Sequence, residues 1–546
     1  MATQALASEP HQRVVDLNRQ VHPFASMIFL AILGAGLIFA GYNIFNDTAH
    51  VGEPLALGAF LFLGLALLIA LGFEFVNGFH DTANAVATVI YTNSMAPVAA
   101  VVWSGTWNFI GVVTSSGAVA YSIITLLPVE LILNVGSAGG YAMIFALLLA
   151  AVIWNLGTWW LGLPNSSSHA LIGSILGVGL ANQLLAAGGT GGTSGVDWAQ
   201  AQSVLLTLLV SPIIGFIGAM VLLWVMKKVI RNPELYKEPK RDTPPPLGIR
   251  SLLVFTCTAV SFAHGGNDGQ KGMGLIMLIL IGVAPTAYAL NRTMPASSTP
   301  AFVQSVDAAH NIFVAHAQGA TVTPQDAPKI LTGALRTHVA DKPEVYAALD
   351  QVSTDIKQQL QSYGAIAHVP AAATRNLRNQ MYVVYGTLNL LTKDAEKAKN
   401  VYPNGDDKKL KAYQGLLEKG TRYIPTWVKI SVALALGLGT MVGWKRIVVT
   451  VGEKIGKTHL TYGMGASAEL MAASTILLAQ FKGMPVSTTH ILSSGVAGAM
   501  AGNGSGVQVS TVRNIALAWV TTLPAAMAIA GGLYFIFLHI AQAIVG

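Results

Sequence analysis

Long apolar tracts, separated by short polar loops, dominate the sequence. A helix that crosses the hydrocarbon core of a bilayer needs about 20 mostly apolar residues, and most of these tracts have that length. They predict about eleven membrane crossings, at 24–44, 54–92, 98–126, 140–162, 165–185, 201–226, 250–288, 425–444, 458–482, 486–502 and 510–540. The predicted fold class is therefore an all-α polytopic membrane protein.

Composition supports this prediction and removes other classes. Only 10% of the 546 residues are charged, whereas about a quarter are charged in a typical soluble domain. The net charge of +7 gathers in short loops such as 227–241 and 444–457, which indicates cytoplasmic loops rather than a nucleic-acid surface. The single cysteine excludes a disulfide framework and a cysteine-ligated metal site.

Two pairs of motifs indicate an internal repeat. FVNGFHDTANA at 75–85 aligns with FAHGGNDGQKG at 262–272, and LPNSSSHALIGSILG at 163–177 aligns with MPVSTTHILSSGVAG at 484–498. The two offsets, 187 and 321, differ by 134 residues, the length of a polar segment at 291–424. Five predicted crossings in each half force opposite orientations. Inverted repeats with broken helices and re-entrant hairpins are typical of secondary transporters.

The polar segment 291–424 has the pattern of amphipathic helices, and the predicted topology places it outside, in the periplasm of a Gram-negative cell. A spacer or a partner-binding role is the expectation for it. The predicted division of the chain is an N-terminal tail and first helix at 1–53, a first repeat at 54–226, a cytoplasmic basic loop at 227–249, the start of a second repeat at 250–290, the helical insertion at 291–424, and the remainder at 425–546.

Each copy of the first motif places one aspartate, Asp81 or Asp268, among polar residues and glycines that are expected to break the helix of a long apolar tract, 54–92 or 250–288. A carboxylate in the membrane core is costly, so it pairs with a cation or lines a wet pathway. Both aspartates are therefore candidate ligands of a coupling ion or metal. Asn77, Asn84 and Asn267 can offer amide oxygens to a cation or N–H groups to an anion. The alternative is an interhelical hydrogen-bond network without a ligand.

The same motifs contain basic side chains. His80 and His264 lie close to the aspartates in sequence, and histidine titrates near physiological pH, which favours a role in proton coupling. Imidazoles also suit a soft divalent metal. Lys271 aligns with the neutral Asn84. Three roles stay open for it: pairing with Asp268, replacing a bound cation, or contacting an anion directly.

The second motif contains a proline, three hydroxyl residues and then an apolar helix. The two triplets are Ser166, Ser167 and Ser168, and Ser487, Thr488 and Thr489. Hydroxyl side chains cap the first free N–H groups of a helix, and a helix N-terminus attracts anions. Two such starts facing each other predict a cage for a tetrahedral oxyanion. The alternative is ordinary capping. His169 and His490, which follow the triplets, have either a structural role, a proton-relay role, or an orienting role.

The motifs resemble those of the PiT family of inorganic phosphate transporters, in particular the bacterial low-affinity type. The resemblance lies in NGFHDTANAVATVIYTNSM, AHGGNDGQKGMGLI, WNLGTWWLGLPNSSSHALIG and MPVSTTHILSSGVAG, in that family's order. The family consensus is close to G-x-N-D-x-A-N-A in each half. This chain has His80 in place of the first Asn, and Gln270–Lys271 in place of the last Ala–Asn of the second copy. The added positive charge puts sodium coupling in doubt.

The resemblance implies import of inorganic phosphate across the bacterial cytoplasmic (inner) membrane by proton symport. It also implies that phosphate travels partly as a neutral complex with a divalent metal (Mg, Ca, Zn, Mn or Co), with no resident cofactor. The phosphate-binding residues carried over by motif, together with Lys271, are Asp81, Asn84, Ser166, Ser167, Ser168, Asn267, Asp268, Ser487, Thr488 and Thr489. Those assigned to a coupling ion or metal are Asn77, His80, Asp81, His264 and Asp268.

Several alternatives stay open. The same architecture suits a sodium-coupled carrier or another oxyanion such as arsenate or sulfate, and a channel is a less favoured alternative. A further alternative is an intramembrane hydrolase that uses serine and histidine near Pro164 or Pro485. The sequence contains neither a G-x-S-x-G elbow nor an H-E-x-x-H pair, so no enzymatic activity is expected. The expected partners are phosphate, protons, divalent metal ions and the lipid bilayer, without nucleic acid. A homodimer is a possible assembly that the sequence does not fix.

Overall fold

The computed structural model describes residue 17 and residues 23–52, 55–186, 196–240 and 243–545, apart from the side chains at 23, 82–84, 130, 186 and 544–545. The predicted tail before residue 17 lies outside this range. The described chain folds into helices, plus one isolated bridge between Gly456 and Val507. The first helices are α1 (Pro23–His50), α2 (Leu57–Tyr91), α3 (Pro97–Thr114), α4 (Ala118–Ile124), α5 (Val129–Leu133), α6 (Ala138–Trp160), α7 (Ser167–Ala186), α8 (Trp198–Val229), α9 (Leu247–Val283) and α10 (Pro285–Tyr288).

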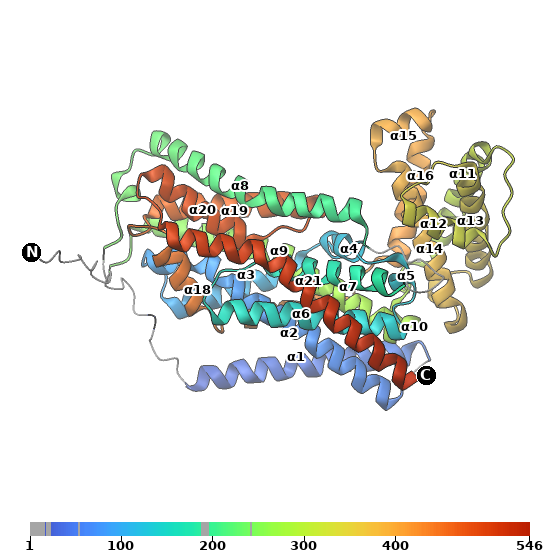
Figure 1. Ribbon diagram of the computed structural model, residues 1–546, viewed down its shortest axis with the longest axis horizontal. Coiled ribbons are helices and arrows are strands. Elements are labelled where there is room, and N and C mark those ends of the chain that lie inside the picture. The colour runs from blue at the N-terminus through green and yellow to red at the C-terminus, as the bar shows by residue number, and fades with distance from the viewer. Residues whose placement is uncertain (1–16, 18–22, 53–54, 187–195, 241–242, 546) are drawn as a thin grey trace, which may run out of the picture.

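The second part of the chain contains two further groups of helices. Within the insertion they are α11 (Thr299–Ala317), α12 (Ala327–Thr337), α13 (Pro343–Tyr363), α14 (Ala371–Thr392), α15 (Ala395–Val401) and α16 (Asp406–Thr421). After it they are α17 (Thr426–Thr440), α18 (Lys445–Val449), α19 (Tyr462–Phe481), α20 (Thr488–Asn503) and α21 (Val509–Val545). Figure 1 shows α11–α16 gathered beyond one end of the long helices, with α18 toward the opposite end.

Nine helices among the described residues are long and apolar enough to cross a membrane, or ten when the bent pair α16–α17 is counted as one span. The sequence predicted about eleven crossings. The tract 98–126 stops as a helix at Thr114 and resumes as the short α4, while α17 and α20 have only 15 and 16 residues. In these segments the apolar tracts correctly predicted that many of the residues are buried, but they did not predict the lengths of the helices.

The expected breaks in the two longest tracts do not occur, because α2 and α9 run unbroken through both aspartate motifs. Their glycines serve close helix packing instead. A Cβ at Gly78 would lie 2.3 Å from the carbonyl oxygen of Leu436, and one at Gly265 would lie 2.1 Å from that of Asn108. Small residues let the backbones of membrane helices approach this closely. The re-entrant hairpins expected at the triplets stay a prediction.

The helices pair in a pattern that repeats with the two halves exchanged. α3 packs on α9 as α17 packs on α2, and α7 packs on α21 as α20 packs on α8. The two motif helices α2 and α9 also contact each other in opposite directions: Glu74 lies against Gly272, whereas Asp81 lies near His264, earlier in α9. This arrangement is what an inverted repeat would produce, although the inversion of the complete halves stays a prediction.

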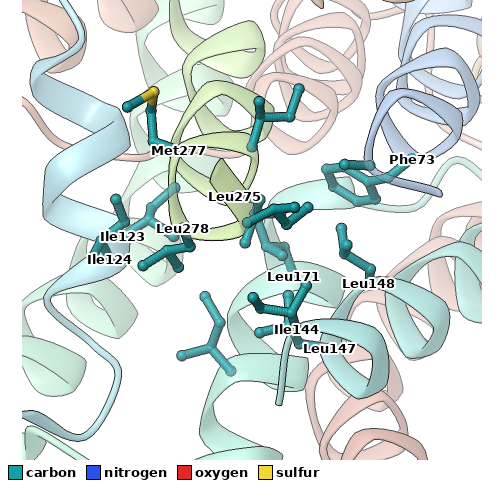
Figure 2. Close-up of a cluster of buried hydrophobic side chains, with 14 of the residues drawn as sticks. Phe73, Ile123, Ile124, Ile144, Leu147, Leu148, Leu171, Leu275, Met277 and Leu278 are labelled. Atoms are coloured by element: carbon teal, nitrogen blue, oxygen red, sulfur yellow. The ribbon is translucent and has the colours of Figure 1, made fainter. Parts of the chain in front are cut away.

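The membrane helices and the insertion have separate apolar clusters. Figure 2 shows apolar side chains of α2, α4, α6, α7 and α9 meeting in one cluster, among them Phe73, Leu148, Leu171 and Leu275. A separate apolar cluster holds α11–α16 together. Close van der Waals packing holds the membrane helices together, whereas burial of amphipathic faces holds the helices of the insertion together.

Candidate functional site

Asp81 of α2 joins both hydroxyl triplets. Ser167 donates a hydrogen bond to Asp81 Oδ2 over 3.1 Å, and Thr489 donates to Oδ1. The two hydroxyls come from the first turns of α7 and α20, helices that lie in different halves of the sequence. Hydrogen bonds to an ionised group are about twice as strong as neutral ones. One buried carboxylate therefore connects the starts of the two short helices.

Asp268 of α9 forms an ion pair with Lys271, which lies about one helical turn further along the same helix. Lys271 Nζ lies 2.8 Å from Asp268 Oδ1 and also donates a hydrogen bond to Ser168. Ser168 in turn donates to the carbonyl oxygen of Val486 over 2.8 Å. Lys271 is completely buried. A buried ammonium is tolerated only with a charged partner and further hydrogen bonds, and Asp268 and Ser168 supply both.

His264 lies between the two aspartates. Its Nε2 is 3.8 Å from Asp81 Oδ2 and 3.7 Å from Asp268 Oδ2, while its Nδ1 is 2.8 Å from Asn108 Oδ1. Because the amide oxygen of Asn108 only accepts, Nδ1 carries the proton and Nε2 faces the carboxylates. Nε2 is then placed to take a second proton or to bind a metal.

These three side chains form a candidate metal centre. Ligand atoms of Asp81, His264 and Asp268 all lie within 4.8 Å of one another. His80 is also close to Asp81, with Nδ1 3.6 Å from Asp81 Oδ1 and Nε2 3.3 Å from Thr158 Oγ1. One imidazole with two carboxylates suits a borderline divalent ion such as Zn²⁺, Mn²⁺ or Co²⁺. Mg²⁺ and Ca²⁺ prefer oxygen ligands alone.

Two of the remaining triplet residues cap the helices, as the sequence predicted. Ser166 accepts a hydrogen bond from the backbone N–H of His169, and Ser487 accepts one from that of His490. Thr488 Oγ1 is buried and has no hydrogen-bond partner within the described part of the chain. The Thr488 hydroxyl is therefore a donor that no described group uses, and it is next in sequence to Thr489, which bonds Asp81.

The predicted amides are dispersed. Asn267 donates to the carbonyl oxygen of Met484 over 3.2 Å, next to the second triplet. Asn77 donates to Glu74 over 3.4 Å, and its buried amide oxygen has no hydrogen-bond partner among the described residues; its assignment to a coupling ion stays a prediction. The side chain of Asn84 lies outside the described residues. Asn267 is thus the predicted amide that the structure places at the triplets.

The two histidines after the triplets contact each other. Their rings, at His169 and His490, lie 4.4 Å apart, and His490 also stacks on Trp519 at 4.0 Å. His169 Nδ1 is 2.9 Å from Ser166 Oγ. These contacts bring α7, α20 and α21 together beside the triplets, and they fit the structural and orienting roles that the sequence left open.

Sequence reasoning missed the residues that orient the histidines. Asn108 of α3 bonds His264 and also donates to Thr440 over 3.3 Å, and Thr158 of α6 contacts His80. An asparagine inside the apolar stretch 97–114 is itself a signal of this kind. Its partner could not be identified from the sequence, because the two residues are 156 positions apart.

The charge balance restricts what the site can bind. Asp81, Asp268 and Lys271 are all buried, and their formal charges sum to −1 when both histidines are neutral. An anion entering this site meets repulsion unless a proton or a metal ion enters too. The arrangement therefore suits an anion only together with a cation.

Comparison with known proteins agrees with this chemistry. The family model described as the phosphate transporter family matches residues 77–530, a range that contains all four motifs apart from the first two residues, 75 and 76, of the first one. The chain belongs to the phosphate transporter family. It is 40% identical over 89% of its length to the low-affinity inorganic phosphate transporter PitB of Escherichia coli, and 41% identical over 90% to PitA; the matches cover 99% of each relative.

Two further proteins are similar to most of the chain. The probable low-affinity inorganic phosphate transporter of Bacillus subtilis is 28% identical over 86% of this chain. A solved structure entitled "The sodium-dependent phosphate transporter" covers 87% of this chain and 98% of its own, at 20% identity and a TM-score of 0.47. The bacterial relatives and the nine candidate spans identify a multi-pass protein of the bacterial inner membrane.

Proposed function

We propose that this member of the phosphate transporter family imports inorganic phosphate by symport with protons, and that part of the phosphate enters as a neutral complex with a divalent metal. One observation carries the proposal. Asp81 and Asp268, from the two copies of one motif, meet in a buried cluster with hydroxyls from both copies of the other. Repeated motifs that meet at the centre of a membrane protein mark a transport site.

The charge of the cluster supports cation coupling. Phosphate at neutral pH carries one or two negative charges, and the three fixed charges of the site already sum to −1. A proton on His264 Nε2 would bring that sum to zero, while a divalent ion between Asp81 and Asp268 would make it positive. Either cation removes the repulsion that phosphate otherwise meets, which is the physical reason for moving them together.

Lys271 disfavours the sodium-coupled alternative. Its ammonium contacts Asp268 and Ser168, two of the groups assigned to phosphate and its cation. A fixed positive charge bonded to Asp268 opposes any bare metal cation in the same space, sodium included, because like charges repel strongly where water is excluded. A proton on His264 avoids much of this repulsion, and a divalent metal that arrives already bound to phosphate enters as a neutral complex. Asp81 and His264 are then the ligands that change state during a cycle.

Substrate chemistry and the role of Asp81 can be tested together in proteoliposomes. Ionised carboxylates only accept hydrogen bonds, so Asp81 favours an oxyanion that carries protons. We expect a tenfold excess of arsenate to suppress uptake of labelled phosphate, and equal sulfate to have little effect. Asp81→Asn should reduce uptake at least about a hundredfold, because it removes charge-assisted bonds to two helices.

The control for this substitution is Asp326→Asn, since Asp326 is exposed on the surface of the insertion. It should transport phosphate normally. Full uptake by Asp81→Asn, at an unchanged amount of inserted protein, would remove Asp81 from the site. If sulfate competed as strongly as arsenate, the site would bind its oxyanion without recognising the protons that the oxyanion carries.

A further inference from the structure

A tryptophan of α21 contacts the surroundings of both hydroxyl triplets. The Trp519 indole N–H donates a hydrogen bond over 3.0 Å to the carbonyl oxygen of Pro164, which lies two residues before the first triplet. The face of the same ring stacks on His490, the residue directly after the second triplet, with the ring centroids 4.0 Å apart and an angle of 26° between the rings. Tryptophan combines an apolar face with a polar N–H, so one side chain makes both contacts.

The next residue of the first loop is held by the same helix. Thr522, about one helical turn after Trp519, donates a hydrogen bond to Asn165 Oδ1. The Thr522 hydroxyl itself accepts a hydrogen bond from the indole N–H of Trp154 over 2.9 Å. Asn165 is completely buried, and its amide donates to Asn155 Oδ1 over 3.3 Å. A polar loop inside a membrane protein is tolerated where such partners satisfy it. The segment 164–165, which leads into the first triplet, is therefore fixed to α21.

The loop before the second triplet has different anchors. Asn267 of α9 donates to the carbonyl oxygen of Met484 over 3.2 Å, and Ser168 of the first triplet donates to that of Val486 over 2.8 Å. On this side of the site, α21 contacts the helix that follows the triplet, through the ring stack described above. Trp519 therefore couples the loop of the first triplet to the helix of the second.

The bonds to Asp81 cannot hold the triplets at a fixed separation while phosphate is bound. Ser167 and Thr489 donate their hydroxyl protons to Asp81 in this structure, and both hydroxyls are also assigned to phosphate. A hydroxyl has one proton to donate, so donation to phosphate replaces donation to Asp81. The contacts of Trp519 use a carbonyl oxygen outside the triplets and an imidazole ring, and they persist when the hydroxyls change partner.

We propose that Trp519 is a positioning residue that sets the separation of the two hydroxyl triplets, and thereby the fit of the site to its oxyanion. It acts through Pro164 and His490 rather than through a bond to the substrate. The inference rests on the proposed function for the identity of that oxyanion. Groups that bind a substrate must be held to within about 0.5 Å by their supporting contacts, and an indole, with two rotatable side-chain bonds, is a rigid spacer of this kind.

Two substitutions separate the contacts of Trp519. Trp519→Phe keeps an aromatic ring next to His490 but loses the N–H that bonds Pro164, whereas Trp519→Leu loses both contacts. In proteoliposomes we expect the KM for phosphate to rise about threefold in the first variant and at least about tenfold in the second. The maximal rate should stay within about twofold. Because a looser pair of triplets selects less by size, the preference for phosphate over the larger arsenate should also fall in Trp519→Leu.

The control is Trp198, an exposed tryptophan at the start of α8. Trp198→Phe and Trp198→Leu should leave both the KM and the preference for phosphate unchanged. A merely structural role of Trp519 would lower the melting temperature and the amount of inserted protein, but it would shift neither the KM nor the preference.

An unchanged KM in Trp519→Leu, with the protein fully inserted, would overturn the positioning role. If that variant fails to insert, a KM in Trp519→Phe equal to that of the unaltered protein would have the same meaning. Absence of phosphate uptake by the unaltered protein would instead refute the proposed function. Binding of labelled phosphate to the purified protein would then test Trp519 alone, and equal affinity in the unaltered protein and in Trp519→Phe would overturn its role.

Discussion

At the scale of single residues, the site depends on ionised side chains that compensate one another without water. Lys271 is the clearest case, since it is completely buried and its ammonium contacts Asp268 and Ser168. Sequence alone predicted that Asp81, His264 and Asp268 belong to the site, because charged and titratable groups in an apolar tract need a reason to be there. It left three roles open for Lys271, and the structure shows the pairing with Asp268.

Lys271→Met should be strongly destabilising, because it leaves Asp268 as a buried charge without its partner. Removing one member of a buried pair costs about 3–5 kcal/mol, so we expect a marked fall in the melting temperature of the detergent-solubilised protein. Combining it with Asp268→Asn should recover most of the loss, since no uncompensated charge then remains. A single variant as stable as the unaltered protein would show that the pair does not form.

At the scale of elements, the apolar tracts predicted where helices lie better than where they begin, bend and end. The sequence placed helix starts correctly at both hydroxyl triplets, where capping is a local property. It placed breaks in α2 and α9 where none occur. A glycine has the same local pattern whether it ends a helix or admits a neighbouring backbone, and only the position of α3 and α17 distinguishes the two cases.

The two kinds of glycine in α2 provide a matched comparison. A Cβ at Gly78 would lie 2.3 Å from the Leu436 carbonyl oxygen and 2.9 Å from the Thr440 nitrogen, whereas a Cβ at Gly64 meets nothing within 4 Å. Gly78→Ala should therefore lower the free energy of unfolding by more than about 1–3 kcal/mol, the usual cost of overpacking. Gly64→Ala should be neutral or stabilising by up to about 1 kcal/mol.

Thermal unfolding of both glycine variants in detergent measures this difference. Because α17 presses on α2 three residues before Asp81, phosphate uptake should fall with stability in Gly78→Ala and stay normal in Gly64→Ala. Equal melting temperatures for the two variants would mean that α2 and α17 are not packed backbone to backbone.

At the scale of the whole molecule, one site is assembled from distant segments, as the predicted repeat requires. Motif offsets in the sequence predicted two related halves, and the structure pairs their helices in an exchanged pattern with α2 and α9 antiparallel. The sequence could not predict that Trp519 contacts Pro164 and His490, because the three residues are far apart in the chain and meet only after folding. Local patterns predict elements, whereas contacts between units require the folded chain.

We propose that phosphate crosses with a proton or a divalent metal rather than with sodium. The most direct measurement is uptake of labelled phosphate into proteoliposomes in sodium-free buffer, with and without an imposed proton gradient, and with and without Mg²⁺ or Mn²⁺. We predict uptake that requires the proton gradient and increases with the metal. Uptake that stays absent until sodium is added would contradict this account, and would show that Lys271 and a sodium ion are accommodated in the same site.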